Sequence, residues 1–277
     1  MAEYSEIILE TRNSVATITL NRPDRLNAWT GIMQAELKDA IFAAGSNDDI
    51  GCIVVTGAGR GFCAGADMEV LREIEPSQGG SDDEGLSTAF ADAPGPDVAP
   101  HFAGRFGYLY SCPKPVIAAI NGPCAGVGFV FALYADMRFA ASDAKFTTAF
   151  SKIGLIAEHG MSLILPRLVG EAHALDILFT ARTFLGDEAE RMGVVNKAMP
   201  GDELMPFVES LTKQMAEHVS PRSIAVMKRQ VRAAYFQNFE EALATADAEM
   251  RDSLAAADFK EGVAAFVERR PPNFAGN

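Results

Sequence analysis

The sequence predicts an α/β protein. Twice, a short apolar segment typical of a buried strand leads into a glycine-rich loop and then into a helix. The first of these units consists of the strand 52–56 and the loop 57–68, and the second consists of the strand 114–120 and the loop 121–128. From Gly201 onward the apolar pattern is helical. We therefore expect a core of strands and helices, followed by a helical region.

The composition excludes several classes of protein. Of the 277 residues, 48% are hydrophobic, which is enough for a large core, so extensive disorder is not expected. The net charge is −13, with 37 acidic and 24 basic residues. This balance argues against nucleic acid as the main partner, because phosphate binding needs clustered Lys and Arg. No run approaches about 18 apolar residues, so no membrane span is expected.

The cysteines and the first residues indicate a reducing compartment. The four cysteines have no CxxC spacing, which predicts reduced and mostly buried thiols. The chain starts with MAEYSEIILE, which is acidic and lacks the basic and apolar pattern of a signal peptide. We therefore expect a cytoplasmic protein.

Local signals predict the remaining elements. Segments 6–10 and 15–20 read as paired strands, with a turn at Asn13 and Ser14. Thr30 is the expected N-cap of a helix that ends near residue 45. Other expected elements are an aromatic-rich helix at 101–110, helices at 171–180, 203–219, 221–236 and 239–256, a helix beginning at Asp187, and a strand at 194–196. Residues 75–100, rich in Gly, Pro, Ser and Asp, predict a long mobile insertion, which is typical of lids and disordered segments.

The loop 57–68 (GAGRGFCAGADM) is the first candidate for a functional site. Four glycines in its first nine residues allow backbone N–H groups to approach an anion or a polarised carbonyl oxygen. No glycine is followed by Lys and then Ser or Thr, which excludes a P-loop, and the dinucleotide fingerprint lacks its third glycine. The ordinary alternative is a tight loop without a ligand. The loop 121–128 also precedes a fully apolar helix, whose first turn near Val127 carries free N–H groups.

Five blocks of the sequence resemble the crotonase (enoyl-CoA hydratase/isomerase) superfamily. In chain order they are 20–28 (LNRPDRLNA), 61–67 (GFCAGAD), 114–122 (KPVIAAING), 165–170 (LPRLVG) and 261–270 (EGVAAFVERR). Several separate blocks in the right order make the resemblance specific. It implies a crotonase-like ββα spiral core over residues 1–200 that binds acyl-CoA, and a C-terminal helical region over 201–277 that builds trimers or dimers of trimers.

The resemblance also implies a binding site. The backbone N–H groups of Ala66 and Val127 would polarise the thioester carbonyl and stabilise the enolate, although many relatives have glycine at the second position. The implied coenzyme A contacts are Arg25 for the phosphates, Ala28, Ala64 and Met68 for the adenine, and Phe266 and Arg269 for coenzyme A bound at a neighbouring subunit. Coenzyme A arrives as part of the substrate. No other cofactor and no metal are expected, since no His, Asp or Glu spacing resembles a metal site.

The expected catalytic residues differ from those of the family's hydratases. These enzymes use two glutamates, and Val130 and Phe150 stand at both positions here. Residues 154–160 (GLIAEHG) resemble the segment of Δ3,Δ2-enoyl-CoA isomerases in which a single glutamate moves the proton, which implies Glu158 as the base. The adjacent apolar run is expected to raise the pKa of Glu158. The ordinary alternative is an acid that favours the N-terminus of a helix beginning at Met161.

Three functions remain open on the sequence. The favoured one is an acyl-CoA enzyme that shifts a double bond with Glu158 as its single base. The first alternative is an enoyl-CoA hydratase that uses Glu158 and an unidentified second group. The second is an acyl-CoA-binding protein without catalysis. His159 and Asp67 are weaker catalytic candidates, because a packed or exposed histidine and a helix cap are the favoured explanations.

Overall fold

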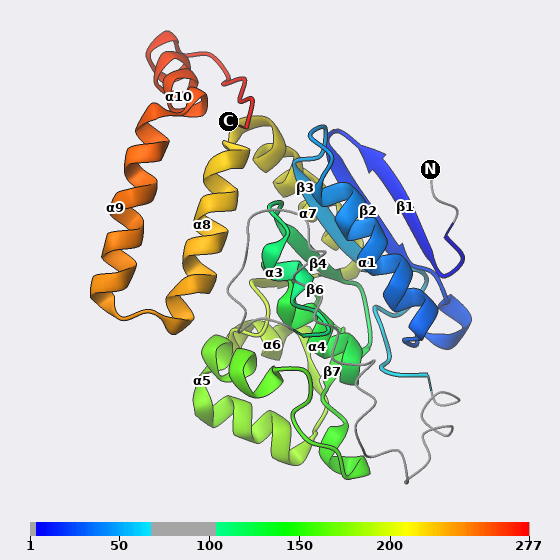
Figure 1. Ribbon diagram of the computed structural model, residues 1–277. Coiled ribbons are helices and arrows are strands. Elements are labelled where there is room, and N and C mark those ends of the chain that lie inside the picture. Colours follow the sequence, from blue (N-terminus) through cyan, green and yellow to red (C-terminus); the bar gives the residue numbers. More distant parts are fainter. Residues whose placement is uncertain (1–3, 68–103, 277) are drawn as a thin grey trace.

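The computed structural model describes residues 4–67 and 104–276 (Figure 1). Its main sheet has six strands in the order β1-β2-β3-β4-β6-β9. These strands are β1 (Ile7–Arg12), β2 (Val15–Leu20), β3 (Cys52–Gly57), β4 (Val116–Ile120), β6 (Met137–Ala141) and β9 (Lys197–Met199). A smaller sheet joins β5 (Cys124–Ala125), β7 (Lys145–Thr147) and β8 (Phe184–Leu185) in that order. The predicted insertion at 75–100 lies outside the described residues.

The sheet begins with a hairpin and continues with parallel strands. Strands β1 and β2 are antiparallel, and Arg12 pairs with Val15 at the turn. The two turn residues, Asn13 and Ser14, have φ values of 51° and 58°. Positive φ at both central positions is the geometry of a type I′ turn, whose twist matches that of the flanking strands. The predicted hairpin is therefore confirmed. The neighbours from β2 to β9 all pair in parallel.

The two faces of the sheet belong to different apolar clusters. Alternate residues of β3 point to opposite faces, as in any strand. Ile53 and Val55 lie in the larger cluster together with Leu37 and Ile41 of α1 (Gly31–Gly45). Cys52 and Val54 lie in the smaller cluster, which includes residues of α7 (Gly201–His218). The sheet is thus covered by helices on both faces, which explains why β3 is buried along its whole length.

Two helices next to the loops form as the sequence predicts. Thr30 caps α1, because its Oγ1 accepts a hydrogen bond from the Met33 N–H at 3.0 Å. Helix α4 (Gly126–Tyr134) is buried at all of its residues. The other helical segments of the core are η1 (Pro23–Arg25), α3 (Tyr108–Ser111), η4 (Phe150–Ile153), α5 (Met161–Thr180) and α6 (Gly186–Met192).

A helical region follows the core, as expected. Helices α8 (Pro221–Ala233), α9 (Phe239–Ala255) and α10 (Ala257–Glu268) extend away from the sheet, with α8 and α9 running side by side (Figure 1). Ion pairs connect α8 to the core. Lys228 Nζ lies 2.7 Å and Arg232 Nη2 lies 3.2 Å from the carboxylate of Asp136, which precedes β6. The short η5 (Ala234–Phe236) extends α8 toward the turn that leads into α9.

Two predicted elements are wrong in position. The predicted strand at 194–196 is not a strand: the Val194 N–H donates to the carbonyl of Ala189 at 2.8 Å and so ends α6, and the strand β9 starts at Lys197. In the segment 101–110, helix α3 begins only at Tyr108, and a turn at 104–107 precedes it. The four cysteines are buried free thiols, as predicted. Within the described ranges, no helix combines the length and apolarity that a membrane span requires.

Candidate active site

The two glycine-rich loops lie against each other. Strands β3 and β4 are parallel neighbours, so the loops that follow them leave the same edge of the sheet. Cys63 of the first loop and Cys124 of the second form an isolated parallel bridge. The Cys63 N–H donates to the Pro123 carbonyl at 3.0 Å, and the Ala125 N–H donates to the Cys63 carbonyl at 2.9 Å. Hydrogen bonds in both directions therefore fix the register of one loop against the other.

Glycine makes the closest approach between these loops possible. Gly65 has a φ of +104°, and a Cβ built on it would lie 3.3 Å from the carbonyl oxygen of Ala125. Gly126 has a φ of +50°, and its added Cβ would lie 3.6 Å from the Gly65 Cα. Both positions need a conformation that side chains disfavour, and both lie in a tight backbone contact. Ala66 and Val127 directly follow these glycines, so they lie next to the backbone contact between the two loops.

The N–H of Ala66 points away from its neighbouring segment. Ala66 forms an isolated parallel bridge with Trp29. The Trp29 N–H donates to the Gly65 carbonyl at 2.8 Å, and the Asp67 N–H donates to the Trp29 carbonyl at 3.0 Å. In such a parallel bridge, the hydrogen bonds to Trp29 are made by the two residues that flank Ala66. The N–H of Ala66 itself is therefore directed away from the Trp29 segment.

The N–H of Val127 belongs to the first turn of α4. Ala125 is the N-cap of this helix, and its side chain makes no capping bond. The first N–H groups of a helix have no intrahelical acceptor, and they carry the positive end of the helix dipole. Together with Ala66, this position provides two backbone donors in adjoining loops. Such a pair is suited to an oxygen that gains negative charge.

Apolar side chains occupy the positions where the family's hydratases carry acids. Val130 is fully buried in α4, and Phe150 is 6% exposed at the start of η4. The Phe150 ring lies 3.9 Å from the Cβ position of Gly126, so it adjoins the loop contact. No carboxylate can reach the two N–H groups from either position. The expected base, Glu158, lies in the segment that follows η4.

Glu158 lies on a turn just before α5. The Met161 N–H donates to the Glu158 carbonyl at 2.9 Å, and the helix begins after Gly160, whose φ is 77°. The first turn of α5 contains no acidic residue. Glu158 therefore precedes the N-cap Gly160 by two residues and is not part of the first turn. Its side chain is 29% exposed, and burial raises the pKa of the carboxyl above its ordinary value, although the charge of Arg105 opposes this shift.

An arginine and a histidine accompany Glu158. Arg105 Nη1 lies 3.2 Å from His159 Nε2, and the same His159 nitrogen lies 3.7 Å from Glu158 Oε2. Burial and the charge of Arg105 lower the pKa of His159 to about 4. Arg105 also donates through Nε to Gln34 Oε1. The sequence predictions missed Arg105 and Gln34. The available signal was one charged residue inside the aromatic segment HFAGRFGYLY.

Aromatic rings surround this charged group. Phe106 makes edge contacts with Trp29 at 5.5 Å, Phe131 at 5.7 Å, Tyr134 at 5.6 Å and His159 at 5.8 Å between ring centroids. These rings come from four different parts of the chain. Phe106 is fully buried and packs in the core. The cluster gives the Arg105 and Glu158 charges an environment of low polarity, which strengthens their interaction.

The predicted coenzyme A residues fall into two groups. Ala28 and Ala64 lie in adjoining segments, since the Ala64 N–H donates to the Leu26 carbonyl at 3.0 Å and the next pair is Trp29 with Ala66. Both are half-buried, and Arg25 is exposed at the end of η1. Met68 lies outside the described residues. These positions adjoin the loop of Ala66 within a single chain.

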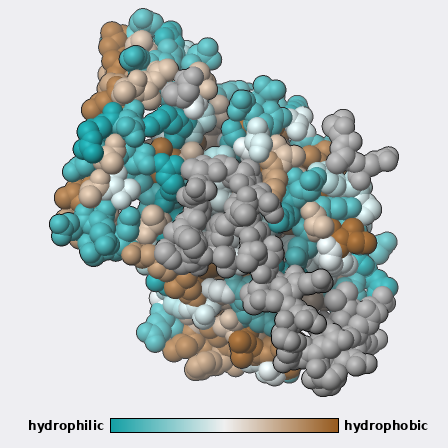
Figure 2. All heavy atoms as spheres, viewed as in Figure 1, coloured by the Kyte–Doolittle hydropathy of each residue, from teal (hydrophilic) through white to brown (hydrophobic). Residues whose placement is uncertain are grey.

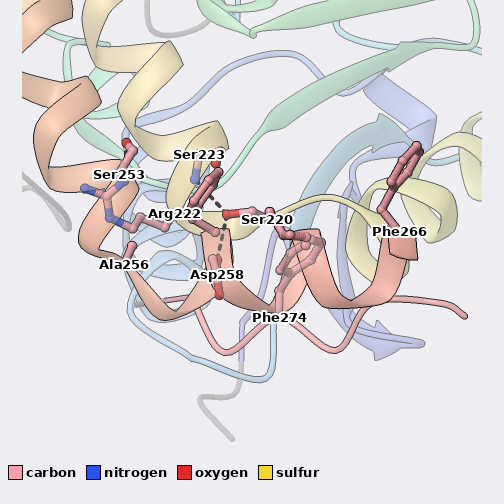
Figure 3. Close-up of a pocket in the computed structure, with 11 residues that line it drawn as sticks. Ser220, Arg222, Ser223, Ser253, Ala256, Asp258, Phe266 and Phe274 are labelled. Atoms are coloured by element: carbon pink, nitrogen blue, oxygen red, sulfur yellow. Dashed lines mark hydrogen bonds between the residues drawn. The ribbon is translucent and has the colours of Figure 1, made fainter. Parts of the chain in front are cut away.

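The other predicted residues lie on the far helices. Phe266, in α10, is 86% exposed, and Arg269 ends the same helix. Phe266 also lines a cavity of about 480 Å³ between α8, α10 and the C-terminal segment (Figure 3). On one wall of this cavity, Ser220 donates to Asp258 at 2.6 Å. The cavity belongs to the helical region, so the structure does not join Phe266 to the two loops within one chain.

The remaining candidates have structural partners. Asp67 is buried, and its carboxylate lies 2.9 Å from Arg22 Nη1, so it forms an ion pair with the strand-to-helix connection before α1. His173 in α5 and His218 in α7 are exposed. In the part of the chain that the structure describes, no cluster of His, Cys, Asp and Glu could hold a metal ion.

Comparisons with known proteins agree with this fold. The family model for enoyl-CoA hydratase/isomerase matches residues 10–277. The 1,2-epoxyphenylacetyl-CoA isomerase of Escherichia coli K12 is 33% identical over 98% of both chains, and a "probable enoyl-CoA hydratase" of Rhodobacter capsulatus is 35% identical over 99% of both.

A solved structure gives the same result. A probable enoyl-CoA hydratase/isomerase from Mycobacterium abscessus superposes with a TM-score of 0.85 at 27% identity, covering 98% of this chain and 99% of that chain. The match extends over nearly the whole of both chains. The chain therefore belongs to the enoyl-CoA hydratase/isomerase family, the crotonase superfamily.

Proposed function

We propose that this protein is an acyl-CoA isomerase that shifts a carbon–carbon double bond, with Glu158 as its single base. The observation that carries the proposal is the distribution of acids around α4. Glu158 is a half-buried carboxyl with a raised pKa beside this helix, whereas Val130 and Phe150 replace both hydratase acids. A base that works near neutral pH needs such a raised pKa, and a hydratase needs a second group that activates water.

In the proposed reaction, the thioester oxygen accepts hydrogen bonds from the N–H groups of Ala66 and Val127. The Glu158 carboxylate removes a proton from the α-carbon of a 3-enoyl-CoA. The electrons of the broken C–H bond move toward the carbonyl, and the resulting dienolate places its negative charge on the held oxygen. The carboxylic acid of Glu158 then returns the proton to the γ-carbon. The product is the 2-enoyl-CoA, and no atom enters or leaves.

The coenzyme A part of the substrate is proposed to bind along the adjoining segments of Ala28 and Ala64, with Arg25 near its phosphates. The half-buried alanines leave room for a flat ring, and the exposed guanidinium suits an anionic group. Coenzyme A would enter and leave as part of the substrate, so no separate cofactor is needed for this reaction.

The names of relatives support both the proposal and its main alternative. One relative is named an isomerase and another a probable hydratase, with similar identity to this chain. The loss of both hydratase acids favours the isomerase. A hydratase would need a water-activating partner for Glu158, and the described side chain that adjoins it, His159, is neutral.

The test is an assay of 3-enoyl-CoA and 2-enoyl-CoA with the unchanged protein and with Glu158→Gln. We expect interconversion of the two isomers, lost in Glu158→Gln and retained in Glu171→Gln, which changes an exposed acid of α5 in the same way. Hydration of 2-enoyl-CoA at ordinary rates would show a hydratase instead. Tight binding of coenzyme A thioesters without turnover of either substrate would identify a binding protein.

We also propose that the protein assembles as a trimer, or a dimer of trimers, through its helical region. Residues Phe239, Leu243, Met250 and Leu254 form a stripe on α9, and each is at least half exposed. A second apolar patch comprises the exposed side chains of Ile153, Ile156 and Phe179. Figure 2 shows apolar residues along the edge of α9 and α10, and again over α5. Two different patches on one chain suit a head-to-tail contact, which closes into a ring.

A further inference from the structure

Arg105 is a charged residue that the proposed chemistry does not yet use. It lies in the turn 104–107 before α3, between the aromatic rings and the turn of Glu158. Its guanidinium lies 5.5 Å from the Phe106 ring centroid. Placing a charge in such surroundings is unfavourable unless hydrogen bonds and an opposite charge compensate it. The partners that compensate Arg105 indicate what it does.

These partners form a chain of contacts from the loop of Ala66 to Glu158. Trp29 forms the parallel bridge with Ala66, and its Nε1 donates to Gln34 Oε1 at 3.3 Å. Gln34 Oε1 also accepts from Arg105 Nε. Arg105 Nη1 reaches His159, and His159 adjoins Glu158. The two parts of the proposed active site are thus joined by side chains as well as by the backbone.

The contact between Arg105 and His159 determines the state of the imidazole. A guanidinium has donors and no acceptor, so Arg105 Nη1 must donate and His159 Nε2 must accept. This assignment places the His159 proton on Nδ1 and leaves the ring neutral. The backbone of the histidine is also fixed, because Tyr134 Oη donates to its carbonyl oxygen at 2.8 Å. His159 therefore acts as a rigid neutral spacer between Arg105 and Glu158.

We propose that Arg105 is a positioning residue, which fixes the neutral His159 ring against which Glu158 packs and supplies the positive charge that faces the carboxylate. This inference rests on the proposed role of Glu158. Before reaction, the Arg105 charge is balanced by the Glu158 carboxylate. After proton transfer Glu158 is neutral and the negative charge lies on the enolate, so the Arg105 charge then favours that intermediate.

Few other described groups bear on the titration of Glu158. Arg105 approaches from the turn before α3, His159 is its neighbour in the chain, and Tyr134 approaches from α4 through the His159 carbonyl. Tyr108 interacts with Arg105, and burial raises the pKa of its hydroxyl and keeps it neutral. Arg105 is therefore the permanent charge that opposes the raised pKa of Glu158.

The test measures kcat and KM between pH 5 and 9 for double-bond isomerisation in Arg105→Gln and Arg105→Lys. In Arg105→Gln we expect kcat to fall about 10²-fold, the loss typical of a displaced catalytic group, with KM nearly unchanged. The acid limb of its pH profile should move to higher pH, because a positive charge beside the carboxyl is lost. Arg105→Lys should keep the acid limb in place and recover part of kcat, since it restores the charge without the planar fork.

A matched control and a double variant complete the test. Arg182→Gln removes an arginine that also lies over a nearby ring, 5.7 Å from the Phe184 centroid, but pairs with Asp176 and Glu188, and we expect unchanged kinetics. His159→Asn suits the φ of +50° at this position. If Arg105 acts through His159, Arg105→Gln with His159→Asn should be no slower than the slower single variant.

The outcomes separate this inference from the proposed function. An unchanged acid limb in Arg105→Gln, or losses that multiply in the double variant, would overturn the positioning role even if Glu158→Gln is inactive. Full activity of Glu158→Gln would overturn the proposed function itself. Circular dichroism of each variant checks folding. If Arg105→Gln does not fold, the test rests on the pH profile of Arg105→Lys. A shift of its acid limb away from that of the unchanged protein would contradict the proposed role of the charge.

Discussion

Cys63 lies directly against Gly128, so the loop of Ala66 packs onto the first turn of α4 without any space for another atom. A Cβ built on Gly128 would lie 2.6 Å from the Cys63 Sγ and 2.7 Å from the Cys63 carbonyl oxygen. The Cys63 carbonyl already accepts the Ala125 N–H. The relative position of the two proposed N–H donors therefore depends on a glycine that is neither of them.

Gly128→Ala should destabilise the protein and impair substrate binding. The added methyl group meets backbone, which cannot move without displacing the loop, and overpacking of this kind typically costs about 1–3 kcal/mol. Gly31→Ala is the matched control: it also lies in a first helical turn, nothing lies within 4 Å of its added Cβ, and we expect a gain of about 0.4–1 kcal/mol. Urea unfolding measures both. Equal stability of the two variants would contradict the tight contact.

Val127→Pro should remove one donor of the proposed oxyanion hole. Proline is tolerated in the first turn of a helix, where the N–H has no intrahelical partner. We expect kcat to fall about 10²–10³-fold, the usual effect of losing one such donor. Val127→Ala keeps the N–H and should retain most activity. If Val127→Pro folds, as judged by circular dichroism, and turns over as fast as Val127→Ala, the N–H of this residue has no role in catalysis.

Glu158→Gln should make the protein more stable at neutral pH while abolishing activity. Because the folded-state pKa of Glu158 is raised, the folded chain binds this proton more tightly than the unfolded chain. That stabilisation is complete below the ordinary carboxyl pKa of 4.5 and is lost as pH rises through the folded pKa. Thermal unfolding at pH 8 should thus give a higher Tm for the variant, and the difference should shrink toward pH 4. A lower Tm for the variant at pH 8 would contradict a raised pKa.

Asp136→Asn should be strongly destabilising, because it leaves two cations near the core without their counter-charge. The Lys228 side chain is 7% exposed and that of Arg232 is 12% exposed. Removing one partner of a buried ion pair typically costs about 3–5 kcal/mol of folding stability. Glu217→Gln, which breaks the exposed pair with Lys213 on α7, should cost at most about 0.5 kcal/mol. Similar losses in the two variants would mean that α8 is held by other contacts.

Local sequence signals predicted the elements that depend on local physics. The turn at Asn13 and Ser14, the cap at Thr30 and the fully apolar α4 were all predictable, because each is specified by residues adjacent in the chain. The strand at 194–196 was wrong because two local signals compete there. Two valines favour a strand, but Gly193 in a left-handed conformation turns the Val194 N–H back onto α6. The helix cap overrides the β propensity of the valines.

The candidate site was predictable only in part. Ala66, Val127 and Glu158 came from short motifs, and the structure brings the loops of the first two together. Arg105 and Gln34 lie 71 residues apart in the sequence, and no motif connects them. Their contact depends on the packing of α1 against the aromatic segment. A single sequence carries no signal for such a long-range polar pair.

Leu243→Glu together with Met250→Glu should dissociate the proposed trimer. The two residues lie seven positions apart on one face of α9, which has no buried residue within a single chain, so charges there should not disturb the fold of the subunit. We expect light scattering after size exclusion to change from three or six chains to one. Ala248→Glu places the same charge on another, exposed face of α9 and should leave the assembly intact. If the unchanged protein already elutes as a single chain, the apolar stripe does not mediate self-assembly. If Ala248→Glu also dissociates it, the contact surface is wider than the stripe.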